Sequence, residues 1–313
     1  MGRKRRSPSQ ECGGPEHAIS RRLFLQGAAL GAASSTLSFN NLFATPAITK
    51  QIKSGQKRCI LLWLTGAPSQ FETWDPKPNT RTGGPFKSIP TNIPGTHISE
   101  LMPYCAKMMD RFAVIRSMKT DSKVHANAIE NLTRGDLPRP PFTRPVLGSV
   151  VSDSLGQPAS GMPGFVLLDP NAEGNEFKRF KAGNFNGWLD AQHAPVRTGG
   201  TYRIANAFRP EGISEKEFKE RETLRVFLSQ QYETERQSRL AAGHNAAFDR
   251  VQGMMSSASL FEIDRLSKRD QLRYGPGAFG LHVLLARHLI ENDTNFVMVA
   301  NGMPWDTHNY NHE

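Results

Sequence analysis

Residues 58–65 read Arg58-Cys59-Ile60-Leu61-Leu62-Trp63-Leu64-Thr65, a continuous apolar run of strand length that ends at Gly66. Continuous rather than alternating hydrophobicity is typical of a central strand in a parallel sheet, because such a strand is covered on both faces. The loop Gly66-Ala67-Pro68-Ser69 follows at the carboxyl end of this strand. Open α/β sheets place their ligands at that end, so this loop is a candidate part of a site.

Further apolar segments alternate along the chain with helical patterns, which predicts an α/β sandwich. Segments 76–97 and 136–164 are rich in Pro and Gly and are predicted to be loops. Strands are predicted at 112–117, 165–168 and 295–300, and helices at 98–109, 125–133, 214–250 and 280–291.

Two of the predicted helices begin at a recognisable cap. Ser99 is the expected N-cap of the helix at 98–109. Ser214 and Glu217 form a capping box at the start of 214–250. This last helix has a patchy apolar face among many charges, which favours a solvated amphipathic helix over a coiled-coil partner surface.

The N-terminal region has the pattern of a twin-arginine export signal. Ser20-Arg21-Arg22-Leu23-Phe24-Leu25 precedes a weakly apolar run, residues 23–39, that is rich in Ala, Gly and Ser. The alternatives are a basic patch before a buried helix and a short membrane anchor. The export interpretation predicts a basic start and signal at 1–44, a linker at 45–57 and a domain at 58–313. Its partner would be the twin-arginine translocase, which carries folded proteins out of the cytoplasm to the periplasm or beyond.

The net charge of +10 does not by itself indicate a nucleic-acid-binding protein. Residues 1–50 hold seven Lys or Arg and two Asp or Glu, so half of the excess lies in the targeting region. The remainder looks spread along the chain, without a basic stripe interleaved with aromatic residues. We therefore expect no nucleic-acid partner, and membrane contact only through an uncleaved N-terminal signal.

Three cysteines, Cys12, Cys59 and Cys105, exclude a cysteine zinc site because no CxxC spacing occurs. A Cys59–Cys105 disulfide is possible in an oxidising compartment. Two separately buried thiols are the favoured alternative.

Two pairs of side chains after apolar strands are candidate metal ligands. Glu72 and Asp75 follow the first strand and could bind a hard divalent cation, although Asp75 precedes Pro76 and could instead organise a turn. Asp306 and His308 follow the strand at 295–300, and in an extended segment alternate side chains share a face. Asp and His are good zinc or manganese ligands, so this second pair is favoured over a surface turn.

His125 is the third candidate, because it begins a predicted helix shortly after a predicted strand. A nucleophile or ligand at that place would benefit from the positive end of the helix dipole. A lone histidine is more often structural, and that alternative stays open.

The chain resembles an exported bacterial family named domain of unknown function 1501. The opening motif is Leu62-Trp63-Leu64-Thr65-Gly66-Ala67-Pro68-Ser69-Gln70-Phe71-Glu72-Thr73-Trp74-Asp75-Pro76-Lys77-Pro78. Further matches occur in the same order at Gly95, 98–103, 114–118, 125–135, 273–275, 284–287 and 305–308.

That family is similar to the alkaline phosphatase and sulfatase superfamily. The resemblance implies a mixed, mainly parallel sheet between helices, with a two-metal site at the strand ends. It also implies that Asp306 and His308 complete one metal site, with zinc, manganese or calcium as the divalent metal.

The chain departs from the superfamily pattern at two places. Thr65 and Gly66 stand where an acid is expected at the end of the first strand, and Glu72 occupies a position where Asp is commoner in the family. His125, rather than Ser, Thr or Cys, lies near the nucleophile position. Further Asp and His elements would lie beyond Glu313, so the alkaline-phosphatase-like domain is expected to be incomplete at its C-terminus.

These features predict a metal-dependent hydrolase of phosphate or sulfate esters that acts outside the cytoplasm. Asp306 and His308 would bind the metal, with Glu72 or Asp75 as assisting ligands. His125 would act as the acid/base or as a ligand. The substrate would be a small-molecule or polymer ester. The alternatives are a non-catalytic exported binding or assembly protein that retains the fold, and an incomplete gene product without a stable fold.

Overall fold

The computed structural model places most of the predicted domain, and the residues it describes all belong to one compact unit, 52–313. The described residues are 57–66, 68–120, 122, 124–135, 143–169, 185–198, 212–236, 248, 252–253, 255, 257–301 and 305. The twin-arginine signal, Asp306, His308 and the side chain of His125 lie outside them.

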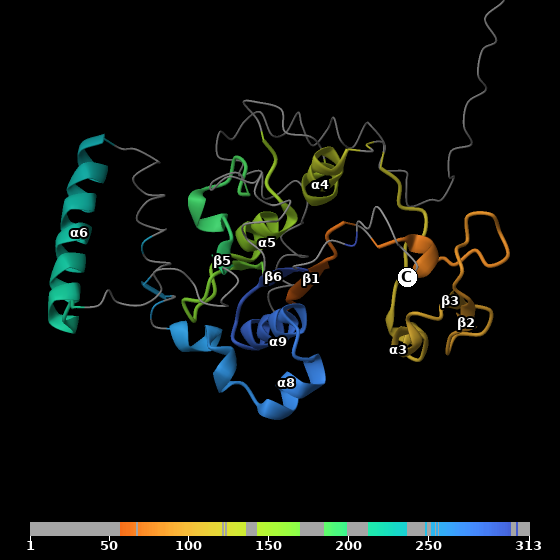
Figure 1. Ribbon diagram of the computed structural model, residues 1–313. Helices are drawn as coiled ribbons and strands as arrows, with labels where there is room; N and C mark the ends of the chain where they lie inside the picture. The colour runs from red at the N-terminus through yellow and green to blue at the C-terminus, as the bar shows by residue number, and fades with distance from the viewer. Residues whose placement is uncertain are drawn as a thin grey trace, which may run out of the picture. The chain divides into compact units, whose positions relative to one another are not determined.

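A four-stranded parallel sheet forms the centre of this unit (Figure 1). Its order is β1 (Cys59–Trp63), β6 (Phe296–Ala300), β4 (Phe165–Leu168) and β5 (Val196–Thr198). Every described pairing in this sheet is parallel, and Val297 of β6 lies between Ile60 and Val166. Strands β4 and β6 are buried along their whole length, as their continuous apolar sequences require.

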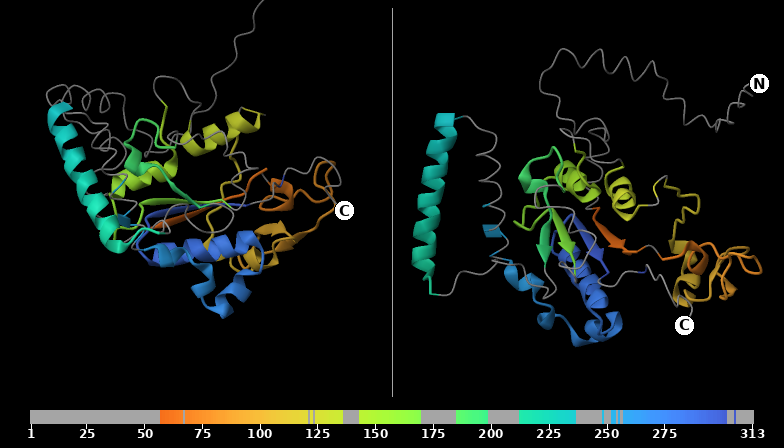
Figure 2. Two further views of the ribbon diagram at one scale, coloured as in Figure 1. Left: turned by 60° about the vertical axis from the view of Figure 1, so that its left-hand side comes forward. Right: turned by 45° about the horizontal axis from the view of Figure 1, so that its top comes forward.

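Helices cover both faces of the sheet (Figures 1 and 2). On one face α9 (Ala278–Glu291) supplies Leu285, Ala286 and Leu289 to a core that includes Val297 and Val299. On the other face α4 (His125–Arg134) and α5 (Leu147–Leu155) lie against a core whose members are Ile129, Val146, Phe165, Leu167, Phe185, Phe296, Met298 and Ala300. The predicted α/β fold, with a mainly parallel sheet between helices, is therefore confirmed.

A smaller cluster is built from residues 70–114. It contains η4 (Gln70–Glu72), the antiparallel pair β2 (Ser88–Pro90) and β3 (His97–Ser99), α3 (Pro103–Ala106) and η5 (Met109–Arg111). Its buried centre is Ile98, Ala106 and Met109. The remaining described elements are η7 (Ala191–His193), α6 (Glu215–Arg236), η8 (Ala258–Phe261), η9 (Ile263–Arg265) and α8 (Lys268–Tyr274).

Several predicted elements are confirmed. The strands at 165–168 and 295–300 are β4 and β6, and the helices at 125–133 and 280–291 are α4 and α9. Helix α6 begins after Ser214, whose hydroxyl accepts a hydrogen bond from the Glu217 amide at 3.1 Å. No helix among the described residues combines the length and apolar character that crossing a membrane requires.

Four predictions about the N-terminal half are wrong. Residues 112–117 form no strand, because Phe112 turns to the Trp74 ring and the Arg116 side chain to the His97 carbonyl. The helix predicted at 98–109 is short, because Ile98 and Ser99 pair with β2 and Pro103 opens α3 instead. The third concerns the two segments predicted as loops, because 76–97 contains β2 and 136–164 contains α5.

The fourth correction concerns β1, which was predicted to be central and covered on both faces. Among the described strands it pairs only with β6, and Leu62 is 47% exposed. Cys59 and Cys105 are free thiols, as the favoured alternative predicted, but neither is buried: Cys59 opens this outer strand and is exposed, and Cys105 is half-buried.

Candidate functional site at the carboxyl edge of the sheet

The ends of β1 and β6 are joined by a buried polar contact. The Thr65 amide donates to Asn301 Oδ1 at 2.5 Å, and the Thr65 hydroxyl donates to the Asn301 carbonyl at 3.2 Å. The Trp305 amide in turn donates to the Thr65 carbonyl at 2.8 Å. Two loops far apart in sequence are therefore held side by side at the carboxyl edge, where α/β sheets bind ligands.

A buried carboxylate lies at the same edge. Asp169 follows the last residue of β4 and is 0% exposed. The Arg197 guanidinium of β5 approaches it, with Nη2 at 3.8 Å from Asp169 Oδ2, and stacks over the Phe185 ring with 5.9 Å to the centroid. A buried charge needs compensation, and a pair at 3.8 Å with a partly exposed guanidinium supplies part of it.

His282 of α9 is a second buried titratable group, and its pKa is affected by the charge of Asp169 at this edge. It is wholly buried, and its Nδ1 donates to the Ala278 carbonyl at 2.7 Å. Burial lowers the pKa of His282, while this hydrogen bond and the negative charge of Asp169 act in the opposite direction. The negative charge of Asp169 therefore acts on the His282 imidazole and opposes the lowering of its pKa by burial.

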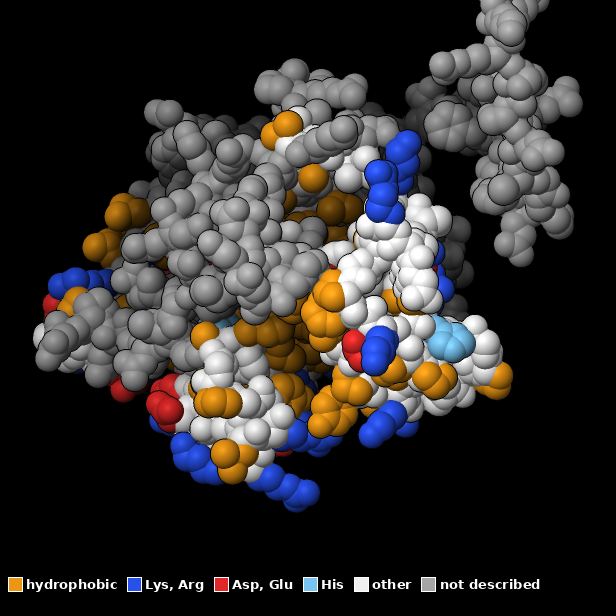
Figure 3. Space-filling model, turned by 45° about the vertical axis from the view of Figure 1, so that its right-hand side comes forward, with side chains coloured by type: hydrophobic (Ala, Val, Ile, Leu, Met, Phe, Trp, Pro, Cys, Tyr) orange, Lys and Arg blue, Asp and Glu red, His pale blue; other side chains and the backbone are white. Residues whose placement is uncertain are grey.

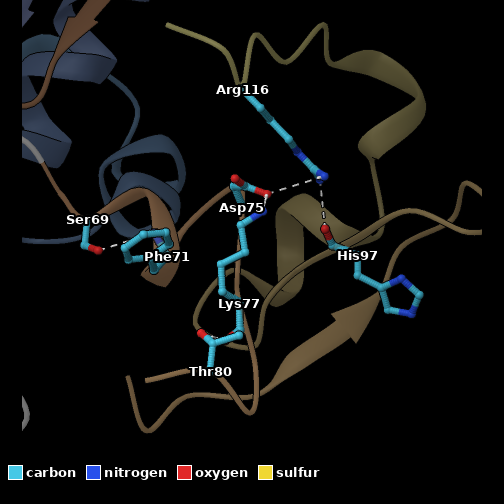
Figure 4. Close-up of polar contacts among 7 residues, drawn as sticks. All are labelled: Ser69, Phe71, Asp75, Lys77, Thr80, His97 and Arg116. Atoms are coloured by element: carbon cyan, nitrogen blue, oxygen red, sulfur yellow. Dashed lines mark hydrogen bonds and ion pairs between the residues drawn. The ribbon is translucent and has the colours of Figure 1, made fainter. Parts of the chain in front are cut away.

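Glu72 and Asp75 lie in the smaller cluster, as Figure 4 shows for Asp75. Asp75 Oδ1 accepts from Lys77 Nζ at 2.8 Å and lies 3.8 Å from Arg116 Nη1. Arg116 also donates to the His97 carbonyl at 3.0 Å. The contacts of Asp75 are thus cations that organise a loop, which favours the turn interpretation of this residue. Glu72 is the last residue of η4.

The other predicted site residues are placed only in part. His125 is the first residue of α4, as predicted, and that helix ends at Gly135 in the left-handed conformation. Asp306 and His308 follow Trp305 but lie outside the described residues. Within the described part of the chain, no three His, Cys, Asp or Glu side chains gather closely enough to hold a metal ion.

Comparison with models of known protein families shows the family to which this chain belongs. The model of a family described as protein of unknown function DUF1501 matches residues 56–313. The chain belongs to the DUF1501 family. No curated protein and no solved structure gives a significant match. The predicted family is therefore confirmed, and its activity has to be inferred from the site.

In this DUF1501 protein, the sequence prediction missed Asp169 and His282. Asp169 comes directly after the continuous apolar run 165–168, the same signal that singled out the segments after β1 and β6, so it could have been found. His282 lies within the predicted helix at 280–291, where a histidine is expected to be a packing or surface residue. Nothing local in the sequence indicates that its helix brings it within reach of the Asp169 charge.

A buried Ser–His–Asp cluster lies elsewhere in the unit. Ser152 Oγ of α5 is 3.3 Å from His193 Nδ1, and His193 Nε2 is 3.4 Å from Asp153 Oδ1. Ser152 is fully buried, and a side chain at Gly164, the residue before β4, would collide with its hydroxyl. A nucleophile must reach substrate, so this cluster serves to join α5 to η7 near the amino end of β4.

Proposed function

We propose that this DUF1501 protein is an exported, metal-dependent hydrolase of phosphate or sulfate esters with its site at the carboxyl edge of the sheet. The observation that carries the proposal is the wholly buried Asp169 carboxylate at that edge, beside the Thr65–Asn301 contact. A buried carboxylate needs compensating positive charge, which Arg197 supplies in part and a bound metal would supplement. The superfamily resemblance and the twin-arginine signal point in the same direction.

The described residues fit a metal site as part of a ligand set. Asp169 offers carboxylate oxygens and His282 an imidazole, the donors that zinc and manganese prefer, and calcium would use the oxygens alone. Asp306 and His308 follow Trp305, whose amide is bonded to Thr65, and we assign them as the principal ligands. A bound divalent metal would polarise the ester oxygen and lower the pKa of a water molecule.

The chain's own residues would position the ester and move protons. His125 begins α4, so an anionic ester near it would meet the free amides and positive dipole end of a ten-residue helix. We assign His125 as the acid/base that exchanges a proton with the attacking water or the leaving group. Under this proposal Glu72 is an additional ligand, and Asp75 is the weaker candidate because Lys77 and Arg116 already contact it.

The alternative is an exported binding or assembly protein that keeps the fold without the chemistry. The observation that favours it is the Asp169–Arg197 pair, because a guanidinium at 3.8 Å already compensates part of the buried charge. A carboxylate balanced in this way can serve stability alone.

Metal content and hydrolysis by the exported protein test the proposal. The full chain is expressed with its signal, purified from the periplasm, and measured for bound metal by mass spectrometry and for hydrolysis of p-nitrophenyl phosphate and p-nitrophenyl sulfate. We expect stoichiometric metal and hydrolysis in the wild type and loss of both in Asp306→Ala/His308→Ala. The matched control is Asp110→Ala, which removes an exposed carboxylate in η5.

Each outcome bears on one hypothesis. Wild-type protein without metal and without hydrolysis overturns the hydrolase proposal. Bound metal without hydrolysis of either ester favours the binding alternative. Metal that persists in the double variant refutes the assignment of Asp306 and His308 as ligands.

A further inference from the structure

The positive charge of the domain is concentrated in one segment, contrary to the even spread that the sequence suggested. Residues 76–119 hold seven Lys or Arg and two Asp or Glu. Residues 120–313 hold 22 and 23. Almost all of the net positive charge beyond the signal region therefore lies in residues 76–119, a segment that overlaps the smaller cluster and contains β2, β3 and α3.

The turns formed by α3 and η5 present apolar and basic side chains together. Ala106 and Met109 face the buried centre of the cluster. The opposite side carries an exposed set that we call the α3 surface: Leu101, Tyr104, Lys107, Met108 and Arg111. Members three or four positions apart lie on the same side of a helical turn. Tyr104 is 78% exposed, and Lys107 Nζ lies 5.9 Å from the centre of its ring.

Exposed apolar side chains near basic residues also occur in the segment that follows η5. Ile115 and Met118 are 69% and 66% exposed, and Lys119 follows Met118 in the chain. Arg116 lies between them but is held by Asp75 and the His97 carbonyl. Figure 3 looks toward this part of the molecule and shows hydrophobic side chains interspersed with Lys and Arg. Large apolar side chains exposed in a group mark a surface that contacts something else.

We propose that the α3 surface docks the protein onto the face of a membrane that contains anionic lipids. Interfacial segments combine exposed aliphatic and aromatic side chains, which enter the acyl boundary, with Lys and Arg, which stay at the headgroups. Both kinds are present here, and Lys107 and Arg111 outnumber the one exposed carboxylate beside them, Asp110, so the net positive charge suits an anionic lipid surface. A nucleic acid is a poorer match, because single strands are bound by stacked aromatic side chains and this surface is mainly aliphatic.

This inference does not depend on the proposed hydrolase. The sequence predicts membrane contact only through an uncleaved signal, whereas the α3 surface provides a second contact that lies on the membrane without crossing it. A protein held at a membrane by its own surface would meet ester substrates there whether or not its signal is cleaved.

Vesicle flotation of the full chain tests the proposal. The vesicles are phosphatidylcholine alone or phosphatidylcholine with phosphatidylglycerol, and the signal is common to every variant. We expect binding to the anionic vesicles to fall about tenfold or more in Lys107→Glu/Arg111→Glu and in Tyr104→Ser/Met108→Ser, since each basic residue near such a surface contributes roughly a factor of five. The matched control is Leu224→Ser/Phe227→Ser, which removes equally exposed apolar side chains from α6, where acidic and basic residues alternate.

A second measurement is independent of binding by the signal. Tyr104→Trp places a reporter at the most exposed position of the surface, and lipids brominated in the acyl chain quench indole that enters the membrane. We expect stronger quenching than in the wild type. Equal quenching, or equal flotation of the α3-surface variants and the wild type, overturns the proposal. So does concentration-dependent self-association in the absence of lipid that Tyr104→Ser/Met108→Ser abolishes, because the surface would then bind a second copy.

Discussion

His282 shows how the fold changes the chemistry of a single side chain. Its imidazole is wholly buried in α9, with Nδ1 committed to the Ala278 carbonyl. Burial lowers the pKa of His282 below its ordinary 6.5, and the Asp169 charge reverses only part of that effect. Burial likewise lowers the pKa of His288 on the same helix. Both groups are therefore harder to protonate in the folded protein than in the unfolded chain.

The free energy of unfolding should depend on pH because of these two histidines. Above pH 6.5 both states hold neutral imidazoles, so the stability is fully present. As the pH falls below that value the unfolded chain takes up protons first, and stability is lost. Urea denaturation at several pH values should give a smaller loss in His282→Asn, which keeps a donor for the Ala278 carbonyl but does not titrate.

His288→Asn should remove a further part of the pH dependence of the free energy of unfolding. The double variant His282→Asn/His288→Asn should show the weakest pH dependence of the three. An unchanged pH profile in His282→Asn would contradict this account of its burial.

At the scale of elements, the sheet and α5 approach closely at one glycine. A side chain at Gly148 would lie 2.6 Å from the Phe165 ring, which leaves no room for a methyl group. The ring cannot simply turn aside, because Phe165 packs edge-on against Phe296 with their centroids 5.4 Å apart. Gly148 therefore sets how closely α5 packs on β4.

Gly148→Ala should destabilise the protein although alanine favours helix. The helical preference gains at most about 1 kcal/mol, whereas overpacking a core costs about 1–3 kcal/mol. Chemical denaturation should show a net loss. Combining it with Phe165→Leu, which removes the ring, should cost less than the sum of the two single changes.

Gly277→Ala is the matched control, because nothing lies within 4 Å of its position. It should change stability by less than about 1 kcal/mol. A Gly148→Ala variant as stable as this control would show that α5 can shift away from the sheet.

Local patterns predicted those elements whose stability is local or whose burial is complete. Strands β4 and β6 are short continuous apolar runs, and α6 begins at the capping serine Ser214. The predictions of secondary structure failed where contacts with residues distant in sequence determine the local structure. The sequence predicts a helix at Ile98, but this residue pairs with Ile89 in a hairpin. It predicts a strand at Phe112, but this ring packs at a tilt against Trp74. Neither partner can be identified from the residues next to it in sequence.

At the scale of the whole molecule, the chain has two basic regions and a nearly neutral remainder. Residues 1–50 contain the twin-arginine pattern, residues 76–119 contain the α3 surface, and residues 120–313 are almost balanced. Under the proposals made above, the first region directs export and the second holds the exported protein at a membrane.

Export should depend on the identity of Arg21 and Arg22 and not on their charge. Arg21→Lys/Arg22→Lys keeps both charges but removes the planar guanidinium groups, so we expect the protein to remain in the cytoplasm. Cell fractionation followed by immunodetection measures this. The matched control is Arg5→Lys/Arg6→Lys, a second arginine pair in the same region, which should be exported normally. Export of both variants to the same extent would contradict the twin-arginine interpretation.

The sequence by itself determined that this is an α/β protein of the DUF1501 family, because continuous apolar runs, helix caps and a specific motif around Thr65 are readable along the chain. Only the tertiary structure decided the strand order β1-β6-β4-β5. That order places Asp169 at the same edge as Thr65 and Asn301, and it places His282 within reach of the Asp169 charge. The physical reason is that strand neighbours are chosen by the packing of whole faces, and residues distant in sequence meet only when those faces are assembled.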